Sequence, residues 1–161
     1  MASFETRLED FIEDAGWNID YQDGQVVSNW GEVFSVEIVP NEECSGLFGL
    51  TYLREKKIEL RQPCDGYLDG KVADSEEELM AHVLAHEVGH TDAYPVSIVM
   101  EASIISFGLI GCLMSKSPRP AAYAVLGLMA SKLVLDEMMA EGCASVLHDS
   151  PFFYSYYFYG E

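Results

Sequence analysis

The pentapeptide His86-Glu87-Val88-Gly89-His90 places two histidines four residues apart, with a carboxylate directly after the first. In an α-helix with 3.6 residues per turn, side chains at this spacing lie on one face. Their neutral ring nitrogens would then bind one zinc ion, and a zinc site that keeps a position for water needs a third protein ligand. The pentapeptide therefore predicts a helix that packs against a second, ligand-bearing segment.

The residues around the pentapeptide predict a helix of roughly 17 residues. Ser75 and Glu78 form a capping-box pattern before an apolar stripe, and Pro95 is expected to close the helix. Gly89 disfavours a helix by about 1 kcal/mol, which close approach of another backbone beside the metal would explain. His82 lies one turn before the motif, and we expect it in the core or behind the ligands, because three stacked histidines rarely bind one ion.

Glu137 is the expected third ligand. Glu137 and Glu141 lie four residues apart among small residues, which would let their helix approach the first one closely. Glu141 would then accept the free ring N–H of a ligating histidine. Glu101 is an alternative third ligand, and a solvated acidic face is an alternative role for the two glutamates. The other downstream candidates are Asp136, His148 and Asp149.

The two motifs together resemble those of the gluzincin zinc peptidases. The pattern Glu137-x-x-Ala140-Glu141 is similar to the Glu-x-x-Ala-Asp motif of the CAAX prenyl endopeptidases and bacterial membrane heat-shock proteases, with a glutamate in place of the aspartate. The short chain makes a minimal soluble gluzincin the closer analogy. The resemblance implies a peptidase in which Glu87 takes a proton from the attacking water. The zinc ligands that it implies are His86, His90 and Glu137.

Two apolar runs, Val96–Met114 and Ala121–Leu135, predict a helical hairpin. We expect it to be buried in the fold or in a dimer, because a membrane span needs about 20 residues and the second run is shorter. Glu101 would also cost about 3 kcal/mol at mid-span. Membrane insertion is the alternative, and Lys116 and Arg119 in the turn would then lie in the cytosol, with the metal motif on the other side.

The N-terminal half predicts a helix at Phe4–Ala15, stopped by Gly16, and then several strands. The expected strands are Gln25–Asn29, Val33–Val39, Leu47–Leu53 and Lys57–Leu60. We therefore expect an α+β, zincin-like fold with a small antiparallel sheet. It would form a single domain over residues 1–161, divided into a sheet subdomain (1–74) and a helical subdomain (75–161). An extended peptide would add to the sheet edge above the metal cleft.

The composition limits the partners and the compartment. Twenty-seven acidic and nine basic residues give a net charge of −18, so nucleic acid and anionic lipid are poor partners. Basic peptide substrates and adaptation to high salt both remain as explanations of this charge. The four cysteines have no paired metal spacing, and the acidic N-terminus does not resemble a signal peptide. We therefore expect free thiols and a cytoplasmic location.

The C-terminal run Pro151–Tyr159 contains seven aromatic residues. It is expected to pack on the core, or to supply a tyrosine hydroxyl that stabilises the oxyanion. The sequence as a whole predicts a zinc-dependent endopeptidase. Two alternatives remain open: a zincin-fold binding module that cleaves nothing, and a membrane-associated interaction protein anchored by the 96–135 hairpin.

Overall fold

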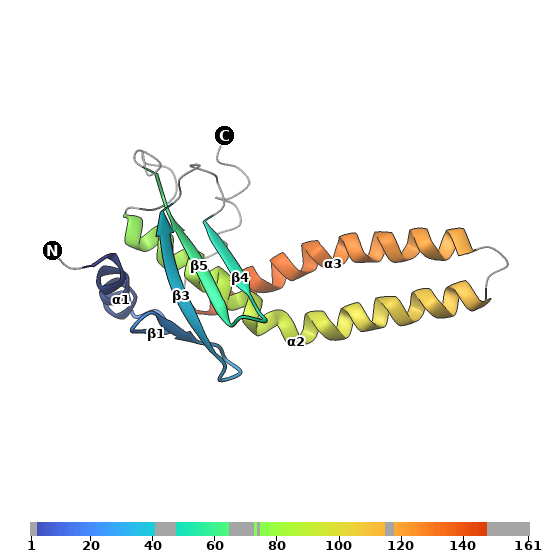
Figure 1. Ribbon diagram of the computed structural model, residues 1–161, viewed down its shortest axis with the longest axis horizontal. Helices are drawn as coiled ribbons and strands as arrows, with labels where there is room; N and C mark the ends of the chain where they lie inside the picture. Colours follow the sequence, from blue (N-terminus) through green and yellow to red (C-terminus); the bar gives the residue numbers. More distant parts are fainter. Residues whose placement is uncertain (1–2, 41–47, 65–72, 74, 115–117, 148–161) are drawn as a thin grey trace.

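The computed structural model describes residues 3–40, 48–64, 73, 75–114 and 118–147. Within these ranges the fold is α+β, with three helices and one mixed five-stranded sheet. The elements are α1 (Phe4–Asp14), β1 (Asp20–Gln22), β2 (Gln25–Val27), β3 (Val33–Pro40), β4 (Gly49–Tyr52), β5 (Lys57–Gln62), α2 (Glu76–Met114) and α3 (Pro118–Leu147). The sheet and α1 gather at one end of the molecule, and α2 and α3 extend from that end as a long hairpin (Figure 1).

The first helix, α1, forms where the sequence predicts it. The Ser3 hydroxyl accepts a hydrogen bond from the Thr6 backbone N–H, which satisfies one of the free donors at the helix start. Gly16 follows the helix with a φ of 68°, a left-handed conformation that glycine adopts without strain. Leu8 and Ile12 point into the core, so α1 presents one apolar stripe to the rest of the domain.

The strand order is β1-β2-β3-β5-β4, and this corrects the expected antiparallel sheet. The two strands β3 and β5 pair in parallel, with Val36 opposite Ile58, whereas the other neighbouring pairs are antiparallel. The reason is that β4 and β5 form a hairpin whose second strand docks beside β3. Strand β4 is left at the edge, with β5 as its one partner among the described strands.

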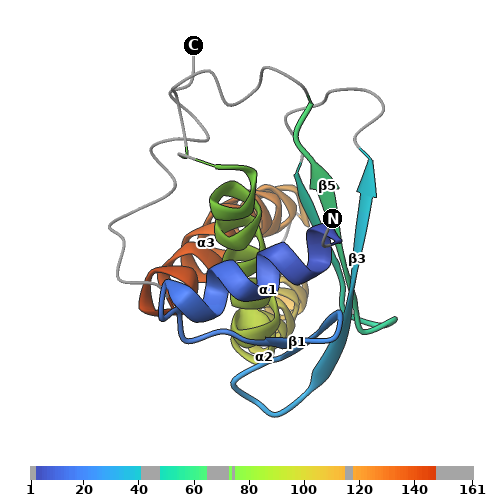
Figure 2. The same ribbon diagram turned by 90° about the vertical axis from the view of Figure 1, so that its left-hand side faces the viewer.

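The hydrophobic core lies between the sheet, α1 and the first part of α2. Figure 2 shows the N-terminal part of α2 beside the sheet, with α1 crossing in front of it. The buried apolar residues of α2 continue from Leu79 to Ala93, and beyond that point only Ile104 is buried. The largest fully buried side chains are Phe34, Leu8, Ile58, Leu60, Leu79, Met80, Leu84, Val26 and Val83.

The prediction that α2 ends at Pro95 is wrong, because the helix continues through this residue to Met114. Proline lacks the N–H that would bond to the carbonyl four residues earlier, so it bends a helix where flanking residues keep the helix going. The axis of α2 changes direction where its colour turns from green to yellow (Figure 1). The apolar run after Pro95 pairs with α3, and this packing stabilises the continuation.

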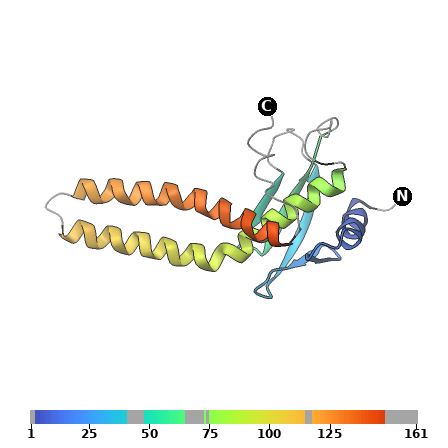
Figure 3. The ribbon, with the colours of Figure 1, turned by 180° about the vertical axis from the view of Figure 1, so that it is seen from behind.

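The hairpin is not buried in the fold, so this part of the expectation is wrong, whereas burial in a dimer stays a prediction. Figure 3 shows α2 and α3 lying side by side and extending away from the sheet. Among the described residues, α2 alone is long and apolar enough to cross a membrane by length and composition. Only 6 % of its most apolar 18-residue stretch is buried. Most of the surface of the two apolar runs has no partner within the described chain.

The cysteines differ from the expectation of four free thiols. Cys64 is disulfide-bonded, whereas Cys112 and Cys143 are free. Spacing in the sequence does not reveal this pairing, because the connectivity depends on how the chain folds.

Candidate metal centre

His86, His90 and Glu137 meet where α3 packs against α2. The Glu137 Oε2 atom lies 3.3 Å from His86 Nε2 and 3.6 Å from His90 Nε2. One potential ligand atom from each of the three residues lies within 4.8 Å of the other two. Ligand atoms that are each about 2.0–2.1 Å from a tetrahedral zinc ion are about 3.4 Å apart. The three side chains therefore fit the donor set and the spacing of a zinc site, as the sequence predicted; metal binding itself stays a prediction.

Glu141 lies beside His86, at the position expected for it. Its Oε2 is 3.0 Å from His86 Nδ1, and the residue is only 3 % exposed. A buried carboxylate at Nδ1 keeps the proton on that nitrogen and leaves Nε2 free to bind a metal. Burial lowers the pKa of His86, but its hydrogen bonds with Glu137 and Glu141 outweigh this effect and raise the pKa to about 9.

Glu87 lies in a buried position under the edge strand β4. It is 6 % exposed, and the Thr51 hydroxyl lies 2.7 Å from its Oε2 and 3.1 Å from its backbone carbonyl. A Cβ atom at Gly49 would overlap the side chains of Glu87 and Val83, so any larger residue at this point of the strand would have to displace them. Burial raises the pKa of Glu87, although the Thr51 hydrogen bond opposes this.

Thr51 and Gly49 are two site residues that the sequence analysis missed. Both lie in the expected strand Leu47–Leu53, whose apolar alternation gave no reason to single them out. A glycine inside a strand pattern often marks a close approach by another group. This signal would have pointed to Gly49, whereas no local signal identifies Thr51.

Gly89 allows α2 and α3 to touch beside the metal ligands. A Cβ atom at this position would lie 2.8 Å from the backbone carbonyl carbon of Ala140, and still closer to its oxygen. The reason suggested for Gly89, close approach of a second backbone, is therefore confirmed. This contact sets the helix separation at which Glu137 reaches both histidines.

A second cluster missed by the sequence analysis fixes the β2–β3 turn to α2 directly after the ligands. The Asp92 carboxylate accepts hydrogen bonds from the Asn29 backbone N–H at 2.8 Å and from its side-chain amide at 2.6 Å. The Trp30 indole N–H donates to the Asp92 carbonyl at 2.9 Å. These three bonds hold the sheet against the helix within one turn of His90.

The other candidates lie elsewhere. His82 is buried and packs against Trp17, with ring centroids 4.8 Å apart, which agrees with the expected core role. Glu101 is exposed along the hairpin and does not belong to the His86, His90 and Glu137 group. Asp136 pairs with Lys132 at 2.6 Å. His148, Asp149 and the aromatic run lie outside the described residues.

No protein-family model, curated protein or solved structure matches this chain. The functional interpretation therefore rests on the site itself. Two imidazoles and a carboxylate converge on one point, a second carboxylate orients one imidazole, and a buried glutamate lies on the sheet side of the same helix. Such a site is suited to hold zinc beside a proton acceptor.

Proposed function

We propose that this protein is a zinc-dependent endopeptidase of the gluzincin type. The observation that carries the proposal is the convergence of His86 Nε2 and His90 Nε2 on one oxygen of Glu137, while Glu141 occupies the Nδ1 side of His86. A simple surface ion pair between Glu137 and His86 would not require Glu141, the buried carboxylate on the other side of the His86 ring. Three protein ligands also leave a fourth position of a tetrahedral ion for water or substrate.

The position of β4 supports a peptide as the substrate. This strand is at the edge of the sheet that the described residues form, and its Gly49 and Thr51 contact the Glu87 side chain. An extended peptide that pairs with a sheet edge is held by main-chain hydrogen bonds, which accept many sequences. A peptide added along β4 would lie over the helix that carries the metal ligands.

The residues of the site divide the reaction between them. Zinc bound here supplies a Lewis acid that polarises the scissile carbonyl and makes a water molecule more acidic. Glu87 takes a proton from the attacking water and delivers it to the leaving amine, as a general base and then a general acid. Thr51 orients the Glu87 carboxylate through its hydroxyl, and Glu141 keeps the His86 ring in place.

A zinc-binding module that cleaves nothing is the second candidate. The hydrogen bond from Thr51 to Glu87 favours it, because a glutamate held at 2.7 Å by a neighbouring hydroxyl could have a structural role alone. The two candidates share the metal site and differ in hydrolysis, so one set of variants separates them.

The decisive experiment combines metal analysis and hydrolysis of a broad peptide library by the purified full chain. We expect stoichiometric zinc in the wild type and a loss of both zinc and activity in Glu137→Ala. Glu87→Gln should keep the zinc and lose at least about a hundredfold in kcat, the lower end of general-base contributions. Glu13→Gln, on the exposed face of α1, is the matched control and should change neither quantity.

Each contrary result would remove a different part of the proposal. Zinc retained by Glu137→Ala would exclude Glu137 as the third ligand. Full hydrolysis by Glu87→Gln would exclude Glu87 as the base. A wild-type protein that binds zinc and cleaves no peptide would favour the binding module.

A further inference from the structure

The described part of the hairpin beyond Ala93 is apolar on nearly all of its faces. On α2, the residues that are not exposed form one stripe toward α3, and the matching stripe on α3 faces α2. The remaining positions are exposed and almost all apolar; the most exposed include Leu113, Met114, Tyr123, Phe107, Leu133 and Leu126. A helix that is apolar all around is typical of a protein interior or a membrane.

A second copy of the chain would cover only part of this surface. Two hairpins packed side by side would bury one face of each. The exposed apolar side chains, such as Phe107 on α2 (71 % exposed) and Leu126 on α3 (65 % exposed), are instead distributed around the whole hairpin. A lipid bilayer, in contrast, covers every face at once.

The polar groups along the hairpin are arranged as expected for an apolar surrounding. The hydroxyls of Ser103, Ser106 and Ser131 each donate to the carbonyl four residues earlier in the same helix. Lys132 is neutralised by Asp136. Glu101 is the exception to this arrangement, because it is exposed about 10 Å along α2 from Tyr94, although side chains on α2 tilt toward the sheet end.

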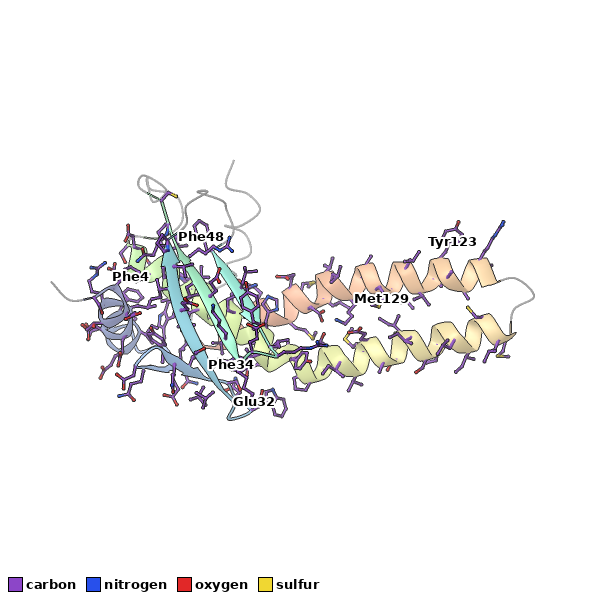
Figure 4. The ribbon with its side chains drawn as sticks, in the orientation of Figure 1. Phe4, Glu32, Phe34, Phe48, Tyr123 and Met129 are labelled. Atoms are coloured by element: carbon purple, nitrogen blue, oxygen red, sulfur yellow. The ribbon has the colours of Figure 1, made fainter. Side chains whose placement is uncertain are left out.

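The two ends of the hairpin carry the types of residue that proteins place at the two surfaces of a bilayer. Residues 94–114 rise about 30 Å, which matches the hydrocarbon thickness. Trp30 and Tyr94 are exposed where α2 leaves the sheet, and Tyr123 lies near the opposite end (Figure 4). Aromatic residues of this kind concentrate at membrane interfaces. Lys116 lies between α2 and α3 in the sequence, and Arg119 is in the first turn of α3.

We propose that the α2–α3 hairpin spans a lipid bilayer, with the end that carries Lys116 and Arg119 on the cytosolic side and the sheet with the metal cluster on the opposite side. These two basic residues set the orientation, because lysine and arginine are retained in the cytosol. The disulfide of Cys64 agrees with it, since disulfides persist in oxidising compartments. This proposal does not depend on zinc binding or hydrolysis.

Flotation with neutral phosphatidylcholine vesicles tests the insertion. Neutral lipid is chosen because an uncharged vesicle surface offers no electrostatic attraction to a protein with a net charge of −18. We expect the wild-type full chain to float with the vesicles and to resist extraction at high pH. The double variant Phe107→Asp/Leu126→Asp should lower the floated fraction at least tenfold, because both side chains would face lipid. Val33→Asp, an equivalent change at an exposed site on β3, should float like the wild type.

Far-UV circular dichroism then checks that the double variant is still helical, since both residues are exposed and their replacement should not unfold the chain. A wild type that stays in the aqueous phase as a monomer or as a dimer would overturn the insertion. Equal flotation of the double variant and the wild type would also overturn it.

Thiol labelling tests the orientation. In spheroplasts of a bacterium that expresses the chain, Ser35→Cys on β3 should react with an impermeant maleimide. Ser117→Cys in the turn should react only after lysis. Both variants carry Cys112→Ser and Cys143→Ala to remove the free thiols. The reverse labelling pattern would overturn the orientation, and labelling of both sites before lysis would overturn the span.

Discussion

Glu141 differs from Glu137 because it contacts His86 on the Nδ1 side, away from the point where His86, His90 and Glu137 meet. Its carboxylate is buried and lies 3.0 Å from His86 Nδ1. Partners of this kind fix the ring orientation and the tautomer of a ligating histidine. The glutamate, one methylene longer than the aspartate of the family it resembles, reaches the ring at normal hydrogen-bond distance.

Replacing Glu141 by glutamine should therefore weaken zinc binding without abolishing it. We expect the affinity, measured by competition with a chromogenic chelator, to fall by about ten- to a hundredfold. The amide still offers an acceptor oxygen, but it lacks the charge that strengthens the hydrogen bond to the imidazole. An unchanged affinity would mean that His86 is held by packing alone.

At the residue scale, the sequence predicted the parts of the site that depend on short spacing. His86 and His90 lie on consecutive turns of one helix, so their convergence required only that the helix form. Glu137 could be inferred as a ligand because the site needed one and small residues accompanied it. Thr51 could not be identified, because its contact with Glu87 depends on the position of a strand edge.

The contact between α2 and α3 is the element-scale feature on which the site depends. At Gly89 the backbone of α3 lies too close for any side chain, whereas a Cβ atom added at Gly127 on α3 would meet nothing within 4 Å among the described residues. The same substitution at the two glycines thus has opposite consequences.

Gly89→Ala should force the two helices apart and destabilise the protein by about 1–3 kcal/mol, the usual cost of overpacking. Zinc affinity should fall as well, since Glu137 would move away from the histidines. Gly127→Ala is the matched control, and it should leave zinc affinity unchanged and add up to about 1 kcal/mol of helix stability. Chemical denaturation and chelator competition measure the two effects. Equal behaviour of both variants would contradict the role of Gly89.

Elements were predictable from the sequence where a local signal fixes them. The Glu78 backbone N–H donates to the Ser75 hydroxyl at the start of α2, as the capping pattern indicated. The parallel pairing of β3 with β5 was missed because strand order is set by long-range docking. Strand β1 was missed because three residues are too few to show alternation. Pro95 misled the prediction because packing against α3 overrides its local effect.

At the scale of the whole molecule, charge and apolar surface are separated. Residues 1–78 carry 19 acidic and six basic residues, whereas residues 94–135 contain only four charged residues. The sheet end of the molecule is therefore strongly negative, and the hairpin is nearly neutral. A negative field around the metal centre attracts basic peptides and repels acidic ones.

Salt should consequently weaken the hydrolysis of basic peptides. We expect KM for a lysine- and arginine-rich peptide to rise between about 0.01 and 1 M ionic strength, as the Debye length falls from about 30 Å to about 3 Å. KM for a neutral peptide of equal length should stay nearly constant. If both peptides were instead cleaved faster at high salt, and the unfolding temperature rose in parallel, the acidic surface would reflect adaptation to salt.

The ligands of the metal centre come from both arms of one hairpin, whose far ends are already joined by the turn between α2 and α3. An ion bound to His86, His90 and Glu137 would thus close the chain into a ring. Neither arm of such a ring can slide along the other by a helical turn, or twist away from it, without breaking a coordinate bond. Occupancy of the site would then restrict the relative motion of the two helices, and removal of the ion would free a separation of the arms whose amplitude is greatest at the metal end, opposite the turn that joins them.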